Sequence, residues 1–296
     1  MIRHWLAAIR PRTLPVAVVP VLVGSVLAWY DAGALSLPVL LATALAALLI
    51  QGATNLHNDV ADYERGADDP LSRLGPPRAT AEGWLTPGSV RIGAALLFSA
   101  AAVVGAWLVV VGGWPILLVG IASIVSGWAY SGGPLPIAYT RLGEPFVWLF
   151  FGVIAVSGSY YLQAAQLTLV ALAAGAVLGL PAAAVLVVNN YRDLEHDRRA
   201  GRRTFAVSFG RPASRGYYAV LMLLPFACLP LFALAGTSGW LLAYAALPWA
   251  LLLVRRFVRG TPGRTFNVLL ADTARFQLAF GVLVSAGLLL AGPRAG

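Results

Sequence analysis

The chain alternates between long apolar stretches and short polar connections. Nine of these stretches have the length that a helix needs to cross about 30 Å of hydrocarbon at about 1.5 Å per residue. The pattern predicts an all-α integral membrane protein with nine transmembrane helices in one bundle, and residues 1–296 forming a single membrane-embedded domain. The predicted spans are 15–30, 38–55, 92–111, 114–130, 145–162, 167–188, 217–235, 240–254 and 276–291.

The composition supports a membrane protein and argues against a soluble domain. Hydrophobic residues make up 59% of the chain and charged residues only 11%, with a mean hydropathy of +0.78, whereas soluble domains carry about 25% charged residues. Arg3 and Arg10 precede the first apolar stretch, and no small-residue cleavage pattern follows, so we expect this span to be retained. The single cysteine, Cys228, has no disulfide partner.

The net charge of +9 comes from arginine, since the chain contains no lysine. Nucleic-acid binding needs a solvated basic surface, but these arginines lie in short loops between apolar stretches, so we expect no nucleic-acid partner. If the N-terminus is cytoplasmic, every arginine except Arg294 falls on the cytoplasmic side, which is the bias that sets membrane orientation. The sequence therefore predicts a cytoplasmic N-terminus and a cytoplasmic working face, with motif loops at about 58–91 and 191–216.

Acidic residues concentrate in these two loops. Eight of the twelve Asp and Glu residues follow either the second or the sixth span. Two similar groups four spans apart are what a duplicated four-helix unit would produce, although the apolar stretches show no repeat. The groups consist of Asp59, Asp62, Glu64, Asp68 and Asp69 after the second span, and of Asp193, Glu195 and Asp197 after the sixth.

Helical spacing of about 100° per residue places the polar residues of each group on one face of a helix that leaves the membrane. Carboxylates that share a face repel one another unless a cation lies between them. Hard oxygen donors, without thiolates or paired histidines, favour Mg²⁺, which also takes substrate phosphate oxygens and water as ligands. The first face holds Asn55, Asn58, Asp59 and Asp62, and the second holds Asn190, Asp193 and Asp197.

Arginines beside the acidic groups indicate that the ligand carries phosphate. Arg78 lies in a Pro-Pro-Arg-Ala-Thr segment, and Arg202 and Arg203 lie in a Gly-Arg-Arg-Thr segment. Guanidinium groups match phosphate oxygens whose charge the metals do not fully neutralise. The alternative is that the acids are merely solvated charges at helix ends. Two matching groups on one side of the membrane favour an anion bridged by metal ions between two acidic helices.

At these residues the sequence resembles the UbiA superfamily of intramembrane aromatic prenyltransferases, whose members carry two Asp-rich motifs after the second and sixth of nine helices. The segment Asn58-Asp59-x-x-Asp62, followed by Gly66 and Asp68, is similar to the first motif. The segment 191–197, followed by the Gly-Arg-Arg-Thr segment 201–204, is similar to the second. The resemblance implies a helical bundle whose central cavity opens to the cytoplasmic side.

Further segments resemble the branch that prenylates 1,4-dihydroxy-2-naphthoate in menaquinone synthesis. The resemblance covers the whole chain, and one departure is Arg202, where lysine is expected. It implies transfer of a polyprenyl group from polyprenyl diphosphate to 1,4-dihydroxy-2-naphthoate in the cell membrane, with loss of CO₂ and diphosphate, giving demethylmenaquinone. The segments that carry it are 10–15, 55–59, 130–136, 158–161 and 189–193.

The motifs and the resemblance together give a set of expected site residues. The expected catalytic acids and metal ligands are Asp59, Asp62, Asp193 and Asp197, with Asp68 as a further metal ligand. Membrane topology explains Arg12 as well as substrate binding does, and the tyrosines equally fit packing or interface roles. The expected substrate-binding residues are Asn55, Asn58, Arg78, Asn190, Arg202, Arg203, Arg12, Tyr130 and Tyr139.

Other acceptors and another class of protein also fit parts of this sequence. Within the same enzyme class the acceptor could be 4-hydroxybenzoate, as in ubiquinone synthesis, or a lipid or haem. A secondary transporter would place acidic residues near the membrane midplane, between inverted repeats. Here the acids lie at the membrane edge, and copies separated by an even number of spans are parallel, so the pattern favours the enzyme.

Overall fold

The computed structural model describes residues 1–68, 73–234, 236 and 238–294, with every side chain in these ranges except that of Arg12. Within these ranges the chain is helical and forms no β-strand. Eight helical segments are long and apolar enough to cross a membrane, which confirms the predicted all-α membrane fold. A further apolar helix, Trp114–Ala129, is shorter, with 16 residues.

Most connections between the helices are short, the longest being that between Glu64 at the end of α3 and Pro87 at the start of α4, and each predicted span coincides with helical structure. A π-helical segment, η3 (Leu149–Ile154), joins α6 to α7 within one span. The elements are α1 (Ile2–Ile9), η1 (Pro11–Thr13), α2 (Pro15–Ala32), α3 (Leu37–Glu64), α4 (Pro87–Gly112), α5 (Trp114–Ala129), η2 (Ile137–Tyr139), α6 (Gly143–Trp148), η3, α7 (Ala155–Ala164), α8 (Leu169–Arg192), α9 (Leu194–Arg199), α10 (Phe205–Leu234), η4 (Ser238–Ala246), α11 (Leu247–Arg259) and α12 (Phe266–Ala291).

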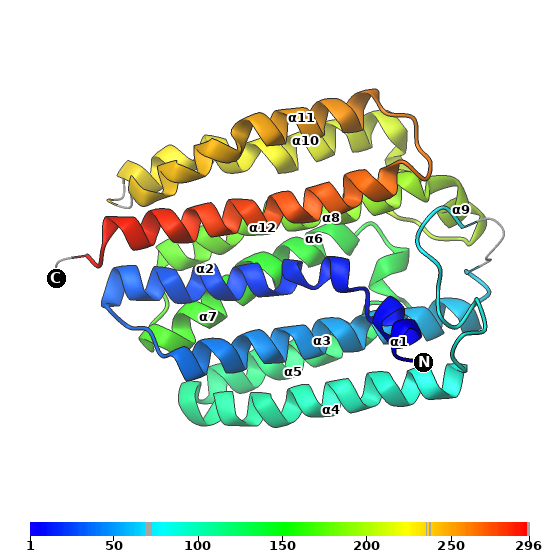
Figure 1. Ribbon diagram of the computed structural model, residues 1–296, viewed down its shortest axis with the longest axis horizontal. Coiled ribbons are helices and arrows are strands. Elements are labelled where there is room, and N and C mark those ends of the chain that lie inside the picture. Colours follow the sequence, from blue (N-terminus) through cyan, green and yellow to red (C-terminus); the bar gives the residue numbers. More distant parts are fainter. Residues whose placement is uncertain (69–72, 235, 237, 295–296) are drawn as a thin grey trace.

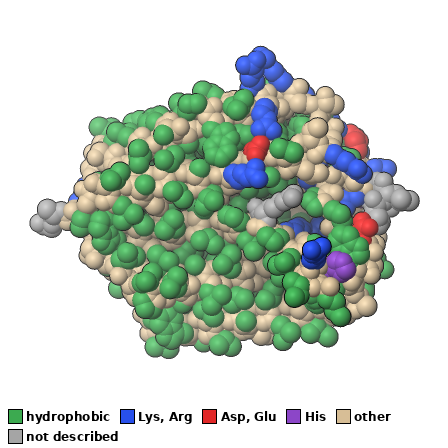
Figure 2. All heavy atoms as spheres, viewed as in Figure 1, with side chains coloured by type: hydrophobic (Ala, Val, Ile, Leu, Met, Phe, Trp, Pro, Cys, Tyr) green, Lys and Arg blue, Asp and Glu red, His purple; other side chains and the backbone are tan. Residues whose placement is uncertain are grey.

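The long helices run side by side along one direction, whereas the short helices α1 and α9 both lie toward one end of the bundle (Figure 1). Helix α3 packs against α4, and α2 packs against α7, α8 and α12. Hydrophobic side chains cover most of the face shown in Figure 2, and the arginine and acidic side chains visible there lie mainly toward the end that holds α9. An apolar outer surface of this kind suits a lipid environment rather than water.

Helical structure extends into both of the predicted motif loops. Helix α3 continues to Glu64, so residues 58–64 are helical, as the spacing of the first acidic group predicts. Helix α10 begins at Phe205, so residues 205–216 are also helical, with non-helical backbone angles at Gly210. Hydropathy marks only where a span leaves the hydrocarbon, and a helix continues further when tertiary contacts hold its polar end.

The π-helical segment packs against α8 with almost no side chains between the two backbones. Gly152 in η3 faces Gly175 and Gly179 in α8, and a Cβ atom on Gly152 would lie 2.5 Å from the Gly175 carbonyl oxygen and from the Gly179 Cα. A Cβ on Gly179 would likewise lie 2.5 Å from the carbonyl oxygen of Trp148. Close backbone contact of this kind is available only to glycine and holds helices together in membranes.

Candidate active site

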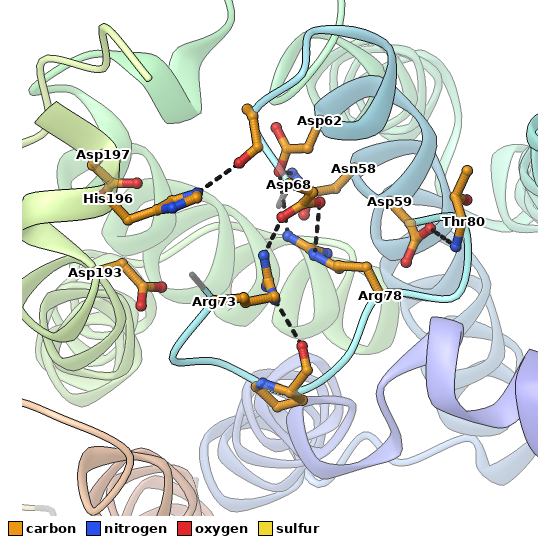
Figure 3. Close-up of polar contacts among 12 residues, drawn as sticks. Asn58, Asp59, Asp62, Asp68, Arg73, Arg78, Thr80, Asp193, His196 and Asp197 are labelled. Atoms are coloured by element: carbon orange, nitrogen blue, oxygen red, sulfur yellow. Dashed lines mark hydrogen bonds and ion pairs between the residues drawn. The ribbon is translucent and has the colours of Figure 1, made fainter. Parts of the chain in front are cut away.

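A cavity of about 860 Å³ runs from the polar end of the bundle into its apolar interior. Helices α2, α3, α4, α5, α7 and α8 contribute to its wall. Its polar end is formed by residues from α3, the loop after α3, and the α8–α9 region, with Arg73 and Arg78 lying between the two acidic groups (Figure 3). The cavity therefore joins an ionic site to an apolar chamber.

Asp62 is the centre of the polar network on α3. The residue is fully buried, and both of its carboxylate oxygens accept bonds. Arg202 Nη2 lies 2.7 Å from Asp62 Oδ1, and the Tyr139 hydroxyl donates to the same oxygen at 3.2 Å. Arg78 Nη2 and Asn58 Nδ2 each donate to Asp62 Oδ2 at 3.2 Å. Asp62 thus holds two arginines at the polar end of the cavity.

Asn58 connects α3 to the N-terminal segment. Arg10 Nη2 donates to Asn58 Oδ1 at 2.8 Å, while Asn58 Nδ2 donates to the Ser131 hydroxyl at 2.7 Å. Arg10 lies at the end of α1 in the left-handed region, with φ of 58°, and it lines the cavity. Burial lowers the pKa of the Arg10 guanidinium. One turn earlier on α3, Asn55 Nδ2 donates to the Ile9 carbonyl at 2.7 Å and fixes the end of α1.

Asp59 faces away from the cavity. Its Oδ1 accepts from the Thr80 backbone N–H at 2.9 Å, and its Oδ2 accepts from the Ala79 N–H at 3.1 Å. Asp59 is 1% exposed and is not among the described residues that line the cavity. Its position anchors the loop that carries Arg78 to α3, which differs from the metal position that its spacing predicted.

Asp68 faces the cavity from the loop after α3. It forms ion pairs with Arg73 and with Arg78, whose Nε lies 3.2 Å from Asp68 Oδ2. That oxygen is buried without a hydrogen bond of good geometry among the described residues. Burial raises the pKa of the Asp68 carboxyl to about 6, and Asp62 adds to this rise, although Arg73 acts in the opposite direction. The acidic residue next to it, Asp69, lies outside the described residues.

The second acidic motif begins where α8 ends. Asp193 faces the cavity and pairs with its neighbour Arg192, whose Nε donates to Asp193 Oδ1 at 2.8 Å. Arg192 also donates to Asn189 Oδ1 at 2.8 Å and to Asn267 Oδ1 at 2.6 Å. Asn267, at the start of α12, donates in turn to the Leu74 carbonyl at 2.9 Å. The motif is therefore tied both to α12 and to the loop after α3.

Asp197 lies on α9 and faces the same end of the cavity. Arg202 Nη1 lies 3.6 Å from Asp197 Oδ1, so this arginine joins α9 to α3. Burial raises the pKa of the Asp197 carboxyl to about 7, and the negative charge of Asp193 adds to this rise, although Arg202 acts in the opposite direction. The Arg202 guanidinium lies 4.4 Å from the centre of the Tyr139 ring, in cation–π geometry. His196 Nε2 lies 2.6 Å from the Ala67 carbonyl and holds the two motifs together.

Deeper in the cavity, Asn190 pairs with an acid that the sequence did not single out. Asn190 Nδ2 donates to Glu144 Oε1 at 2.9 Å. Tyr130 and Phe146, whose rings lie 6.1 Å apart, and Phe150, stacked on Phe146, line the cavity as Asn190 does. Here the ionic site changes into an aromatic and apolar chamber.

The structure brings most of the predicted site residues together, but not all. Four of them do not line the cavity, namely Asp59, Asp62, Tyr139 and Arg203. Asp59 and Asp62 are buried behind other groups, whereas Arg203 is exposed. The backbone N–H of Arg203 donates to the Tyr139 carbonyl at 2.7 Å. Arg12 lies in η1, and its side chain is outside the described part of the structure. The predicted residues that line the cavity are Asn55, Asn58, Asp68, Arg78, Tyr130, Asn190, Asp193, Asp197 and Arg202.

The carboxylates fit Mg²⁺ in chemistry, but they do not form a closed metal cage. Among the described residues, no three His, Cys, Asp or Glu side chains are grouped to hold a metal ion. Arginines take the carboxylate oxygens instead. The pKa values of Asp68 and Asp197 are raised, because the effect of burial is larger than the opposite effect of the arginines. The arginines therefore do not fully balance the charge of these two carboxylates. Hard oxygen donors of this kind, facing a cavity with room for phosphate, suit Mg²⁺.

The fold and the site together define an integral membrane protein with an apolar cavity whose polar end is rich in arginine and acidic residues. The chain belongs to the UbiA prenyltransferase family, whose model matches residues 17–291. It is 35% identical over 286 residues to 1,4-dihydroxy-2-naphthoate octaprenyltransferase from Mycobacterium tuberculosis, covering 96% of each chain. It is 34% identical over 295 residues to the enzyme of that name from Escherichia coli, covering 97% of this chain and 95% of that one.

A solved structure has the same fold. A UbiA homologue from Archaeoglobus fulgidus, bound to DMAPP and Mg²⁺, matches with a TM-score of 0.67 and 17% identity, covering 96% of this chain and 99% of that one. The identity is low, so the match supports the fold alone. The predicted UbiA-type bundle is confirmed at that level.

Proposed function

We propose that this protein transfers a polyprenyl group from polyprenyl diphosphate to 1,4-dihydroxy-2-naphthoate, giving demethylmenaquinone in its reduced form. The observation that carries the proposal is the arrangement of Asp68, Asp193 and Asp197 with several arginines at one end of an apolar cavity. Whole-chain identity of 30–35% to proteins named 1,4-dihydroxy-2-naphthoate octaprenyltransferase supports the acceptor.

The arginines would bind the diphosphate. Arg10, Arg73, Arg78 and Arg202 line the polar end of the cavity, and each already contacts a polar side chain of the acidic network. Their guanidinium groups can donate to several phosphate oxygens at once, which stabilises the charge that develops as the prenyl C1–O bond breaks. Tight networks of this kind also hold the donors in place before the substrate arrives.

Carboxylates that face the cavity would hold the metal. Asp68, Asp193 and Asp197 are placed for this role, while Asp62 positions Arg78 and Arg202 and Asp59 bonds to the loop that carries Arg78. When bound, Mg²⁺ supplies positive charge that stabilises the departing diphosphate.

The apolar part of the cavity would receive the prenyl chain and the aromatic ring. Its walls exclude water from the allylic cation, and the Tyr130 ring can stabilise that cation through its π face. The electron-rich ring then forms a bond to prenyl C1 at the carbon that bears the carboxylate. The bond between that ring carbon and the carboxylate then breaks and CO₂ leaves. The electron pair of the broken bond restores the aromatic ring.

We infer the membrane arrangement from the same features. The eight long apolar segments and α5 would make nine spans in one domain, with the N-terminus and the polar end of the cavity in the cytoplasm. Arginine placement along the chain supports this orientation in the cell membrane. Membrane-impermeant labelling of cysteines introduced at the exposed residues Glu82 and Pro293, in intact cells of a C228S variant, tests it. Labelling of position 82 from outside would contradict the inferred orientation.

Acceptor identity is tested with purified protein, a polyprenyl diphosphate and Mg²⁺. We expect prenylated product and CO₂ with 1,4-dihydroxy-2-naphthoate and none with 4-hydroxybenzoate. Product formed only from 4-hydroxybenzoate would overturn the acceptor assignment. Removal of Mg²⁺ with EDTA should stop turnover, and added Mg²⁺ should restore it. Turnover that survives EDTA would show that arginines alone hold the diphosphate.

A further inference from the structure

Glu144 is a buried acid with one side-chain hydrogen-bond partner among the described residues. It lies in the first turn of α6, is 1% exposed, and accepts from Asn190 Nδ2 at 2.9 Å. Among the described residues it forms no ion pair, and its second oxygen, Oε2, has no hydrogen-bond partner. A buried carboxyl without a basic partner is costly. The cost of burying this carboxyl indicates that it has a specific role.

Contact with Glu144 fixes the orientation of the Asn190 amide. In this contact the Asn190 nitrogen faces Glu144 and donates to Oε1, so the amide oxygen faces elsewhere. Asn190 lines the cavity, whereas Glu144 is not among the described lining residues and lies behind Asn190. Among the described residues, the side-chain hydrogen bond of Asn190 is the one that its nitrogen donates to Glu144, and Oδ1 accepts none. The pair therefore presents a bare acceptor oxygen to the cavity.

The surroundings of this oxygen suit an aromatic ligand with a hydroxyl group. Tyr130, Phe146 and Phe150 line the cavity, with Phe146 and Phe150 stacked at 4.5 Å between ring centres. Phe146 lies two positions after Glu144 on α6, so the same helix turn supplies both the aromatic wall and the amide's partner. Flat rings bind between aromatic side chains, and an isolated acceptor in such a slot selects a ligand O–H.

We propose that Glu144 is a positioning residue that holds the Asn190 amide with its oxygen toward the cavity, where it accepts a hydrogen bond from a ring hydroxyl of the aromatic acceptor. The proposal rests on the proposed function. It assigns the selection of a hydroxylated acceptor to Glu144 and Asn190, which lie deeper than the diphosphate site at the polar end of the cavity. A site built to bond a hydroxyl rejects a ligand that lacks it, because the amide oxygen is then buried without a partner.

The first test is Glu144→Gln, which keeps the shape but lets the side-chain amide turn either way toward Asn190. We expect the KM for 1,4-dihydroxy-2-naphthoate to rise roughly tenfold, the effect of one hydrogen bond. The KM for polyprenyl diphosphate and the Mg²⁺ requirement should stay within about twofold. Glu82→Gln, in an exposed loop position, is the matched control and should change none of these values.

A reversed pair provides the rescue. Asn190→Asp alone would set two carboxylates face to face and should raise the same KM. In the double variant E144Q/N190D the donor and acceptor are exchanged, and an acceptor oxygen again faces the cavity. We expect the KM for the naphthoate to return to within roughly threefold of wild type. A purely structural pair would instead lower kcat and thermal stability, with both KM values rising together.

Substrate variants complete the test. As inhibitors of the wild type, naphthoates that lack the hydroxyls should bind more weakly than the hydroxylated compound, and Glu144→Gln should remove most of that difference. An unchanged difference in the variant would overturn the proposal. A raised Mg²⁺ requirement in the variant would overturn it too, because Asn190 Oδ1 would then be a metal ligand. Failure of the proposed function is separate: the wild type would then form no product from any aromatic acceptor.

Discussion

Arg202 Nη2 lies 2.7 Å from Asp62 Oδ1, and this contact joins the two acidic motifs of the chain. The same guanidinium reaches Asp197 with its other terminal nitrogen, at 3.6 Å. One side chain therefore connects α3 to the segment after α8 at the polar end of the cavity. These carboxylates raise the pKa of Arg202, so the guanidinium is charged at every relevant pH.

Replacing Arg202 with lysine should weaken diphosphate binding. A single ammonium group cannot contact Asp62 and Asp197 at the same time with the planar geometry of a guanidinium. We expect kcat/KM for polyprenyl diphosphate to fall about tenfold to a hundredfold, the range for lost bonds to charged groups. Arg198→Lys, on the exposed side of α9, is the matched control. Equal activity of the two variants would show that Arg202 acts only as a point charge.

Asp62→Asn and Asp193→Asn should each reduce turnover by at least about a hundredfold, as expected when an electrostatic group is removed from a site. Asparagine keeps the shape of aspartate, so both variants should fold. Asp193→Asn should also raise the Mg²⁺ concentration that gives half-maximal rate. Turnover and unfolding temperature in detergent check both statements, and near-normal turnover of either variant would contradict the assigned role.

Asp59→Asn should behave differently from these two variants. Asp59 accepts from two backbone N–H groups, and an asparagine oxygen cannot serve both with the same strength. We expect a loss of about 1–3 kcal/mol in unfolding free energy, the cost of a buried unsatisfied group. The Mg²⁺ concentration for half-maximal rate should be unchanged. A higher Mg²⁺ requirement with normal stability would mean that Asp59 is a metal ligand after all.

Gly105→Leu should shorten the prenyl chain that the cavity accepts. Gly105 lines the cavity on α4, and a Cβ there meets no atom within 4 Å, so the leucine fills open space. We expect turnover of a long polyprenyl diphosphate to fall roughly tenfold, since overfilling a cavity costs about 1–3 kcal/mol. Geranyl diphosphate should react normally. Gly88→Leu, exposed at the start of the same helix, is the control, and equal loss with both chain lengths would exclude a role in length selection.

Much of the fold and part of the site followed from the sequence because they depend on local spacing. Apolar stretches of sufficient length can only be helices in a membrane, and this predicted the spans. Positions four apart meet on a helix, which is why Asn58 and Asp62 contact each other on α3. Adjacent positions diverge by about 100°, so Asn58 and Asp59 cannot both face the cavity. Spacing alone did not predict which of these two side chains would face the cavity.

The rest of the site depends on segments that are far apart in the chain. Arg10 reaches Asn58 from the N-terminal segment, and Glu144 reaches Asn190 from the start of α6. No periodicity connects such pairs, because only the packing of different helices brings them together. An isolated acid next to a predicted span was the available signal for Glu144, and an arginine leading into the first span was the signal for Arg10.

The glycine contact between η3 and α8 sets the distance between the two helices that carry Asn190 and Glu144. Asn190 lies roughly 16 Å along α8 from Gly179, and Glu144 lies roughly 12 Å before Gly152, at 1.5 Å per residue. Both partners of the pair are therefore carried on two helices whose separation is set by the absence of three methyl groups. An alanine at Gly179 would touch no substrate, yet it would appear in an assay as a change in acceptor preference.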